Sequence, residues 1–313
     1  MDGKNYITMQ RLGSLGRFGN CIFQSAFLAC YARQRGLTVQ APMFPGQEIF
    51  SFRFEPVTVK LPEAGERYQT PGDQQTPSIL PCGDEFVNCD WMGYAQFHTT
   101  WYAPFRKQFQ KMFEPVRSKA MEHVRPNHEH RVGIHLRMGD YGRKRGIFWR
   151  APIEWYLDWL HCFWPTFSGK KKLFVAAEDP AAVQRFCRYD PVTSRDVGMA
   201  GTFTDDWMML KQCDIILMPN STFSFTAAMA NPHLKQAWRA SLPAGRFVPI
   251  DPWRATPLQF ERAENYRRRL GRIAQWTWFL GLGRTRFPVD HAETRGNVMR
   301  PHRPRVGRTV PGS

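Results

Sequence analysis

The second half of the chain alternates between two hydrophobic patterns. Runs that alternate apolar and polar residues, or that are continuously apolar over a few residues, are typical of strands, and apolar residues spaced three and four apart are typical of helices. The predicted strands are residues 131–138, 172–179, 215–220 and 247–250, and the predicted helices are residues 152–164, 180–189, 205–213 and 224–231. Strands and helices that take turns in this way predict a parallel sheet covered on both faces.

The first half opens with a strand, a turn and a helix. Residues 6–10 read as a strand, residues 12–20 (LGSLGRFGN) as a glycine-rich turn and residues 21–35 as a helix with one apolar face. This order is typical of nucleotide-binding units, although the turn is neither a GxGxxG fingerprint nor a P-loop. Further along, the pattern predicts short strands at residues 49–54 and 57–61, a surface loop at 63–77 and a helix at 104–113.

The strand at residues 131–141 (RVGIHLRMGDY) carries the first candidate chemistry. Its alternation places His135 and Arg137 on one face, and Gly139 and Asp140 then break the run. Both side chains therefore lie where a strand opens into a loop, the place where open α/β sheets bind ligands. This favours a site for an anion, and the alternative is an ordinary strand that ends in a solvated arginine.

Length and composition set the scale of the fold. The 313 residues, 42% of them hydrophobic, are enough for a substantial core and two domains, which we place at 1–125 and 126–253 with a tail at 254–313. Seven scattered cysteines without a CxxC pair argue against a disulfide framework and a zinc ribbon. The absence of a signal-peptide pattern and of a spanning apolar run predicts a cytoplasmic protein.

The formal net charge of +16 indicates a phosphorylated partner. Residues 254–313 hold thirteen arginines and four acidic residues, so the excess is concentrated in the tail. A basic nucleic-acid-binding protein is the rival class, but no recognised module is present, and we expect no nucleic acid partner.

The tail itself contains a segment rich in arginine and tryptophan, residues 267–287 (RRRLGRIAQWTWFLGLGRTRF). This composition is typical of a segment that lies in an anionic membrane interface, which would put the protein on the cytoplasmic face of a membrane. The alternative is a helix packed back onto the first domain. Residues 291–313 have the composition of a disordered end.

Three separated segments resemble the motifs of one family in the family's order. They are GRFGN at 16–20, HLRMGDY at 135–141 and NSTFS at 220–224, and they resemble motifs of the α-1,2-fucosyltransferases; the first two are also similar to patterns of the α-1,6 and protein O-fucosyltransferases. The resemblance implies a GT-B architecture, in which two Rossmann-like domains with parallel sheets face each other across a cleft. It also implies transfer of L-fucose from GDP-fucose, with inversion and without a metal, to a glycan hydroxyl, with the 2-hydroxyl of galactose expected. A lipid-linked glycan acceptor is expected only if residues 267–287 contact a membrane.

Residue roles follow from the resemblance and from the chemistry. A guanidinium suits a leaving diphosphate because it stays charged and binds two oxygens, so Arg137 is the expected catalytic cation. His135 donates to phosphate or makes a structural hydrogen bond, and Asp140 is either the base or a carboxylate that orients Arg137. The expected donor-binding residues are Gly16, Arg17, Gly19, Asn20, Asp206, Asn220, Ser221, Thr222, Phe223 and Ser224.

Structural alternatives stand beside several of these roles. In place of binding the donor, the polar residues at 220–224 could form a simple helix cap, and Arg17 could be an ion-pair partner. Asp205 and Asp206 either contact guanine or cap a helix. No Asp-x-Asp metal clamp occurs, so we expect no metal cofactor. Two departures from the family pattern, Met138 in place of a second arginine and Phe225-Thr226 in place of aromatic residues, keep open another GDP-sugar or a non-catalytic relative.

Overall fold

A computed structural model describes residues 4–65, 68–70, 73–77, 83–97, 99–116, 129–139, 141–142 and 148–259. All of these residues belong to one compact unit, which spans residues 1–266. The tail segment 267–287, with its proposed membrane contact, and residues 291–313 lie outside the described residues, as does Asp140. Within the described ranges, no helix is long and apolar enough to cross a bilayer.

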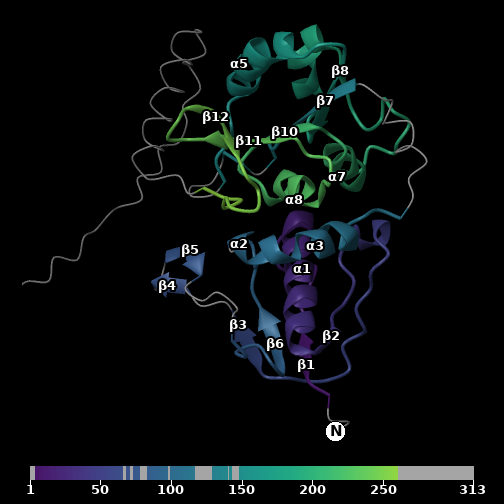
Figure 1. The fold of residues 1–313 in the computed structure, drawn as a ribbon, viewed down its shortest axis with the longest axis vertical. Coiled ribbons are helices and arrows are strands. Elements are labelled where there is room, and N and C mark those ends of the chain that lie inside the picture. The colour runs from purple at the N-terminus through teal and green to yellow at the C-terminus, as the bar shows by residue number, and fades with distance from the viewer. Residues whose placement is uncertain are drawn as a thin grey trace, which may run out of the picture. The chain divides into compact units, whose positions relative to one another are not determined.

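The first of two parallel sheets lies in the N-terminal half. Its strand order is β2–β1–β6–β3, with bounds β1 (Tyr6–Thr8), β2 (Thr38–Gln40), β3 (Glu63–Gly65) and β6 (Cys89–Met92). The long helix α1 (Phe18–Arg35) connects β1 to β2 (Figure 1). It ends at Gly36, whose left-handed backbone (φ 65°) lets its N–H reach the Ala32 carbonyl.

The second sheet has six strands in the order β12–β11–β10–β7–β8–β9. All neighbours are parallel except β11 and β12. The strands are β7 (Glu129–Leu136), β8 (Lys170–Ala177), β9 (Pro191–Val192), β10 (Ile215–Met218), β11 (Gln236–Ser241) and β12 (Arg246–Ile250). The predicted parallel sheet is therefore confirmed, with an antiparallel edge that the sequence pattern did not predict.

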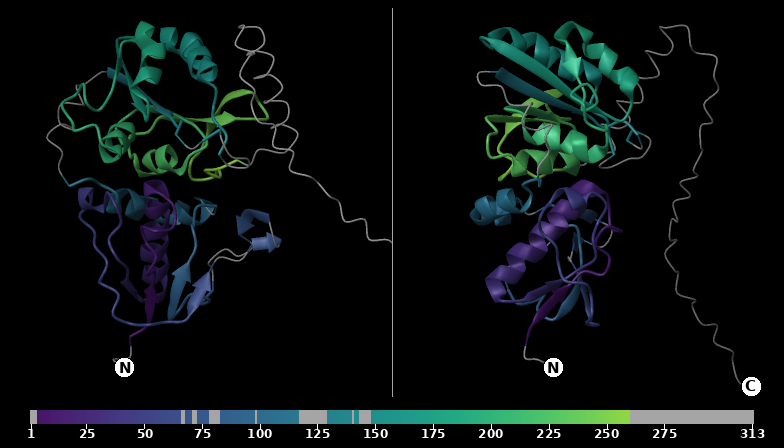
Figure 2. Two further views of the ribbon diagram at one scale, coloured as in Figure 1. Left: turned by 180° about the vertical axis from the view of Figure 1, so that it is seen from behind. Right: turned by 90° about the vertical axis from the view of Figure 1, so that its right-hand side faces the viewer.

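Successive residues of the central strands of this sheet pack against different helices. Ile215 and Leu217 of β10 face the cluster of α5 (Ile153–Phe163), whereas Ile216 and Met218 face α7 (Phe203–Lys211) and α8 (Thr222–Ala230). Figure 2 shows helices on both sides of the sheet. Continuous apolar strands are thus explained by burial on both faces.

One apolar cluster joins the two halves of the unit. It contains Phe23 of α1, Phe109 of α3 (Arg106–Met112), Trp207 of α7 and Phe225 of α8. Helices α1 and α8 are in contact, and the ring centroids of Phe23 and Phe225 lie 6.4 Å apart. The N-terminal end of α1 is therefore built into the same core as the helices that cover the second sheet.

Several predicted elements are wrong or shorter than expected. Residues 57–61 form no strand, because the side chain of Gln40 bonds Thr58 through both its amide atoms at 2.9 Å and takes the place of a ladder. Residues 49–54 likewise contain only the end of a short 3₁₀ turn and an isolated bridge at Phe50. The predicted loop at 63–77 instead holds β3 and the small hairpin of β4 (Tyr68–Thr70) and β5 (Asp73–Pro77).

Two predicted helices divide into shorter pieces. The helix expected at 104–113 is a 3₁₀ turn (Ala103–Phe105) followed by α3, and it is preceded by α2 (Thr99–Tyr102). The helix expected at 180–189 is α6 (Pro180–Val183) continued by a 3₁₀ segment (Gln184–Tyr189). Periodicity placed the helical turns correctly but does not distinguish α from 3₁₀ geometry over so few residues.

Candidate active site

Three parallel strands end side by side at one edge of the second sheet. Arg137 follows β7, Glu178 follows β8, and Ser221 lies just beyond β10. Because carboxyl ends of parallel strands meet at the same edge, side chains from distant parts of the sequence converge there. A cavity of about 1100 Å³ opens at this edge, and all three residues line it.

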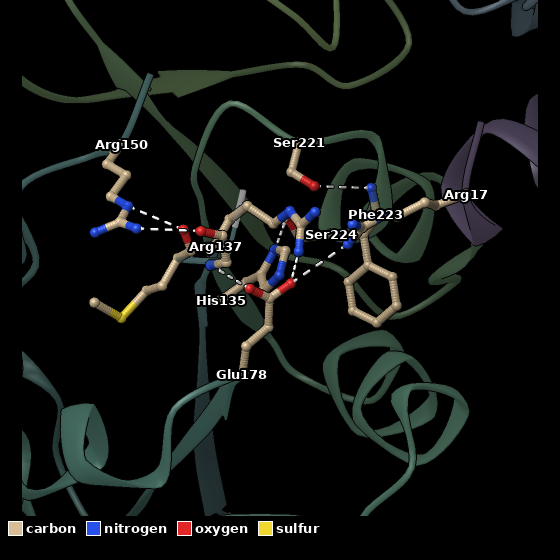
Figure 3. A network of polar contacts seen from close by, with 10 residues as sticks. Arg17, His135, Arg137, Arg150, Glu178, Ser221, Phe223 and Ser224 are labelled. Carbon is tan, nitrogen blue, oxygen red and sulfur yellow. Dashed lines mark hydrogen bonds and ion pairs between the residues drawn. The ribbon is translucent and has the colours of Figure 1, made fainter. Parts of the chain in front are cut away.

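Residues that line the cavity form an ion-pair network (Figure 3). The Arg137 guanidinium pairs with the Glu178 carboxylate, which also accepts a hydrogen bond from the Gly139 backbone N–H. Arg17, from the N-terminal half, places Nη1 3.8 Å from Oε1 of Glu178. Two cations from different halves thus share one carboxylate, and the cluster carries a net positive charge in a partly dry site.

The loop after β7 is held by Arg150. Its Nε donates to the Met138 carbonyl at 2.9 Å, and its Nη2 donates to the Gly139 carbonyl at 3.3 Å. The Met138 side chain packs against the apolar cluster on the α5 face of the sheet and does not line the cavity. The departure from the family pattern at Met138 therefore removes no charge from the cavity wall.

His135 is a buried neutral group under the cavity. Its side chain lines the cavity, and its Nδ1 lies 2.9 Å from Oγ of Ser224 on α8. Burial, reinforced by the neighbouring Arg137, lowers the pKa of His135 to about 3. The imidazole therefore remains uncharged at neutral pH and serves as a hydrogen-bonding group, not as a second cation.

The polar residues around the start of α8 have different roles. Ser221 is the N-cap, and its Oγ accepts from the Phe223 backbone N–H at 3.3 Å. Thr222 donates from its hydroxyl to Oδ1 of Asn20 at 2.7 Å, which ties α8 to α1. Asn220 is fully buried and does not line the cavity, because its amide bonds the backbone of Gln259 at 2.9 and 2.6 Å.

The paired aspartates at the start of α7 have different roles. Asp205 forms a capping box with Thr202, as the capping interpretation predicts. Asp206 lines the cavity, and its Oδ1 accepts from the Ser194 hydroxyl at 2.7 Å. Burial raises the pKa of Asp206 to about 6, against the hydrogen bond from Ser194 and with small contributions from Asp205 and Arg195.

The structure brings most of the predicted site residues together. Those that line the cavity are Gly16, Arg17, Gly19, Asn20, His135, Arg137, Asp206, Ser221, Thr222 and Phe223. Asn220 and Ser224 lie behind the wall, and Asp140 lies outside the described residues. Among the residues described, no cluster of three or more His, Cys, Asp or Glu could hold a metal ion.

Known proteins relate to this chain in sequence and in fold. No family model matches it. It is 26% identical over 255 residues to galactoside alpha-(1,2)-fucosyltransferase 2 of Oryctolagus cuniculus (70% of this chain, 66% of that protein), and 31% identical over 109 residues to galactoside alpha-(1,2)-fucosyltransferase 1 of Bos taurus (31% and 28%). The chain thus spans less than two thirds of the length of either relative.

Solved structures of fucosyltransferases share the fold of this chain. The α-1,6-fucosyltransferase NodZ of Bradyrhizobium, soaked with GDP-fucose, superposes with a TM-score of 0.50 at 13% identity over 79% of this chain and 99% of that chain. A variant of Arabidopsis thaliana FUT1 in complex with GDP gives the same TM-score at 12% identity, over 79% of this chain and 74% of that chain. In sequence and in fold, the chain is similar to fucosyltransferases. Both the predicted resemblance to the fucosyltransferase superfamily and the predicted fold class are confirmed.

Some cavity residues that bear on the chemistry were not predicted from the sequence, among them Glu178, Ser194 and Phe203. Glu178 ends a predicted strand beside Asp179, Ser194 follows β9, and Phe203 opens α7. The position of Glu178 at the carboxyl end of a parallel strand was the available signal, since that edge is where ligands bind. Ser194 and Phe203 gave no signal, because only the folded sheet brings them to Arg137's cavity.

Proposed function

We propose that this chain transfers L-fucose from GDP-fucose to a glycan hydroxyl, with inversion at the fucose carbon and without a metal ion. The observation that carries the proposal is the cluster of Arg137, Arg17 and Glu178 at the edge of the large cavity. Support also comes from the fucosyltransferase relatives and from the GDP-fucose soaked into NodZ. We further propose galactose as the acceptor sugar and its 2-hydroxyl as the acceptor atom.

The proposed reaction places charge where this site offers donors. The acceptor oxygen forms a bond to fucose C1 as the bond from C1 to the β-phosphate oxygen breaks, and the electron pair leaves with GDP. Arg137 stabilises the charge that develops on this phosphate, and its planar fork binds two oxygens at once. Glu178 fixes the orientation of Arg137, while the neutral His135 and the Ser221 cap lie beside the same opening.

The acceptor proton requires a base. Asp140 stays a sequence-based candidate for that base, outside the described residues. We propose that the acceptor is a galactose-ended or lipid-linked glycan and that it approaches along the wall that the N-terminal half contributes. Membrane contact through residues 267–287, and a location at a cytoplasmic membrane face, stay sequence-based proposals.

Turnover assays test the function directly. The full chain is incubated with GDP-fucose and galactose-ended acceptors, with and without EDTA, and GDP release is followed. We expect GDP release that depends on the acceptor and is unchanged by EDTA, with an α-linked product by NMR. Absence of turnover with every acceptor and every GDP-sugar would contradict the proposal, and loss of turnover in EDTA would contradict metal independence alone.

The pKa of Asp206 predicts the pH dependence of donor binding. A guanine base presents two adjacent N–H donors, which an ionised carboxylate accepts with both oxygens, whereas a protonated carboxyl turns one of these oxygens into a donor and binds the base more weakly. Because the folded protein holds the Asp206 proton up to a pH of about 6, affinity for GDP-fucose falls as the pH drops from 7 to 5, approaching about tenfold per pH unit below the pKa. The donor's diphosphate is esterified at both ends and does not titrate in this range.

The matched variants are Asp206→Asn and Asp205→Asn, measured by calorimetric titration with GDP-fucose. We expect Asp206→Asn to abolish the pH dependence of GDP-fucose affinity. Asp205→Asn should weaken the helix cap but leave this pH dependence unchanged. Folding stability gives an independent check. Since the folded pKa is raised, Asp206 stabilises the fold below the unfolded value of 3.8, and this contribution is lost as the pH rises to about 6. An unchanged pH profile in Asp206→Asn would contradict contact with the base.

A further inference from the structure

Four rings form a continuous wall along the cavity. Ring centroids are separated by 5.3 Å between Phe203 and Phe18, 6.2 Å between Phe18 and Phe223, and 5.0 Å between Phe223 and His135. All four residues line the cavity. The wall therefore runs from the first turn of α7 to the end of β7, where Arg137 begins the charged network.

Only one end of this wall offers a free aromatic surface. The side chains of Phe18 and His135 are buried within the protein, with 7% and 5% of their surface exposed, whereas Phe203 is 46% exposed. An exposed phenylalanine is by itself ordinary on a protein surface. Phe203 differs because it lines the cavity of about 1100 Å³ and contacts Phe18 edge to face, at an interplanar angle of 62°.

The two ends of the wall carry opposite polar groups. Asp206 lies one helical turn after Phe203, on the same face of α7, with the Ser194 hydroxyl bonded to its carboxylate. At the other end, Arg137 and Arg17 present guanidinium groups. A matching ligand has a flat aromatic group with N–H donors at one end and an anionic group at the other, which describes a guanine nucleoside diphosphate.

We propose that Phe203 is the stacking platform for the guanine base of the donor and so contributes to the affinity for the nucleotide. The inference rests on the proposed function and adds a residue to it. Stacking on Phe203 would position the base edge against Asp206 and direct the diphosphate along the wall to Arg137. Base stacking on an aromatic side chain is tolerant of base identity, so Phe203 supplies affinity for the base while Asp206 discriminates guanine from adenine.

Calorimetric titration of the full chain tests this role. The probes are GDP and ribose 5-diphosphate, which lacks the base, and the variants are Phe203→Ala, Phe203→Leu and Phe203→Trp. Phe163, which is 36% exposed and does not line the cavity, provides the matched control Phe163→Ala. We expect Phe203→Ala and Phe203→Leu to weaken GDP binding about tenfold, in line with measured base stacking, while Phe203→Trp and Phe163→Ala bind as the wild type does.

The possible outcomes test the stacking role of Phe203 separately from the proposed function. Ribose 5-diphosphate should bind the wild type and Phe203→Leu equally, because it has no base to stack. If Phe203→Leu lost affinity for both probes equally, Phe203 would only shape the site. If GDP binding were unchanged and the KM for the acceptor were raised, the ring would lie against the acceptor. Either result would overturn the inference and leave the proposed function standing. Failure of the wild type to bind GDP would overturn the proposed function itself.

Discussion

Replacing Arg137 with alanine is expected to slow turnover of GDP-fucose about a thousandfold, the loss typical of removing a principal charge-stabilising group. The guanidinium is the cavity cation at the carboxyl end of β7, and its side chain is only 9% exposed, so its interactions are poorly screened. Lysine at this position keeps the charge and loses the planar fork, and we expect an intermediate loss of about thirtyfold. Steady-state GDP release measures both variants.

Controls separate catalysis from folding. In Arg137→Ala, Glu178 keeps the ion pair with Arg17 at 3.8 Å and loses the one with Arg137, so the double variant with Glu178→Gln removes the excess carboxylate charge. Arg185→Ala removes an exposed arginine that pairs with Glu154 at 3.6 Å and does not line the cavity, so this variant should retain full activity. Retention of wild-type kcat by a folded Arg137→Ala protein would contradict the assigned role.

Replacing Gly19 with alanine is expected to destabilise the fold by about 3 kcal/mol, at the upper end of the usual overpacking range. A Cβ atom at this position would lie 2.6 Å from the Phe223 nitrogen and 2.6 Å from the Thr222 carbonyl carbon. Both are backbone atoms of α8 and cannot rotate away. In an open helix the same substitution would stabilise by about 1 kcal/mol, so the sign of the result reports the close approach of α1 to α8.

Urea denaturation measures this effect, and Gly245→Ala is the control. Gly245, unlike Gly19, has a left-handed backbone that alanine disfavours (φ 63°), and it has open space around its Cβ direction, so Gly245→Ala should cost only about 1 kcal/mol. Gly19→Ala should in addition weaken GDP binding, because it displaces the Thr222 contact with Asn20. A Gly19→Ala protein at least as stable as the wild type would contradict the tight helix contact.

The fold was predictable wherever the hydrophobic period was long. The second sheet and its covering helices follow from apolar strands and from helical spacing in residues 153–163 and 222–230. Prediction failed in residues 49–77, where prolines and short segments hide the period and where the Gln40 side chain replaces strand pairing. Strand β3 (Glu63–Gly65) was missed because its residues, Glu-Ala-Gly, show no apolar alternation.

The residues of the candidate site were also predictable only in part. His135 and Arg137 were found because strand alternation fixes which residues share a face. The difference between Asp205 and Asp206 was not predictable, since both are acidic residues in a first turn and only the fold shows which one faces Ser194. Asn220 was expected to bind the donor, and the structure instead uses its amide to hold Gln259. Sequence names the chemical groups, and packing decides how each is used.

The apolar cluster shared by α1, α7 and α8 constrains how a ligand enters. A hinge motion that parted Phe23 from Phe225, or Phe18 from Trp207, would expose rings that now pack at centroid distances of 6.4 and 5.8 Å. Such an opening resembles sub-global unfolding in its free energy and is correspondingly rare. We therefore expect the nucleotide to enter and leave through side-chain movements at the cavity mouth, while the packing of α1 against α7 and α8 is kept.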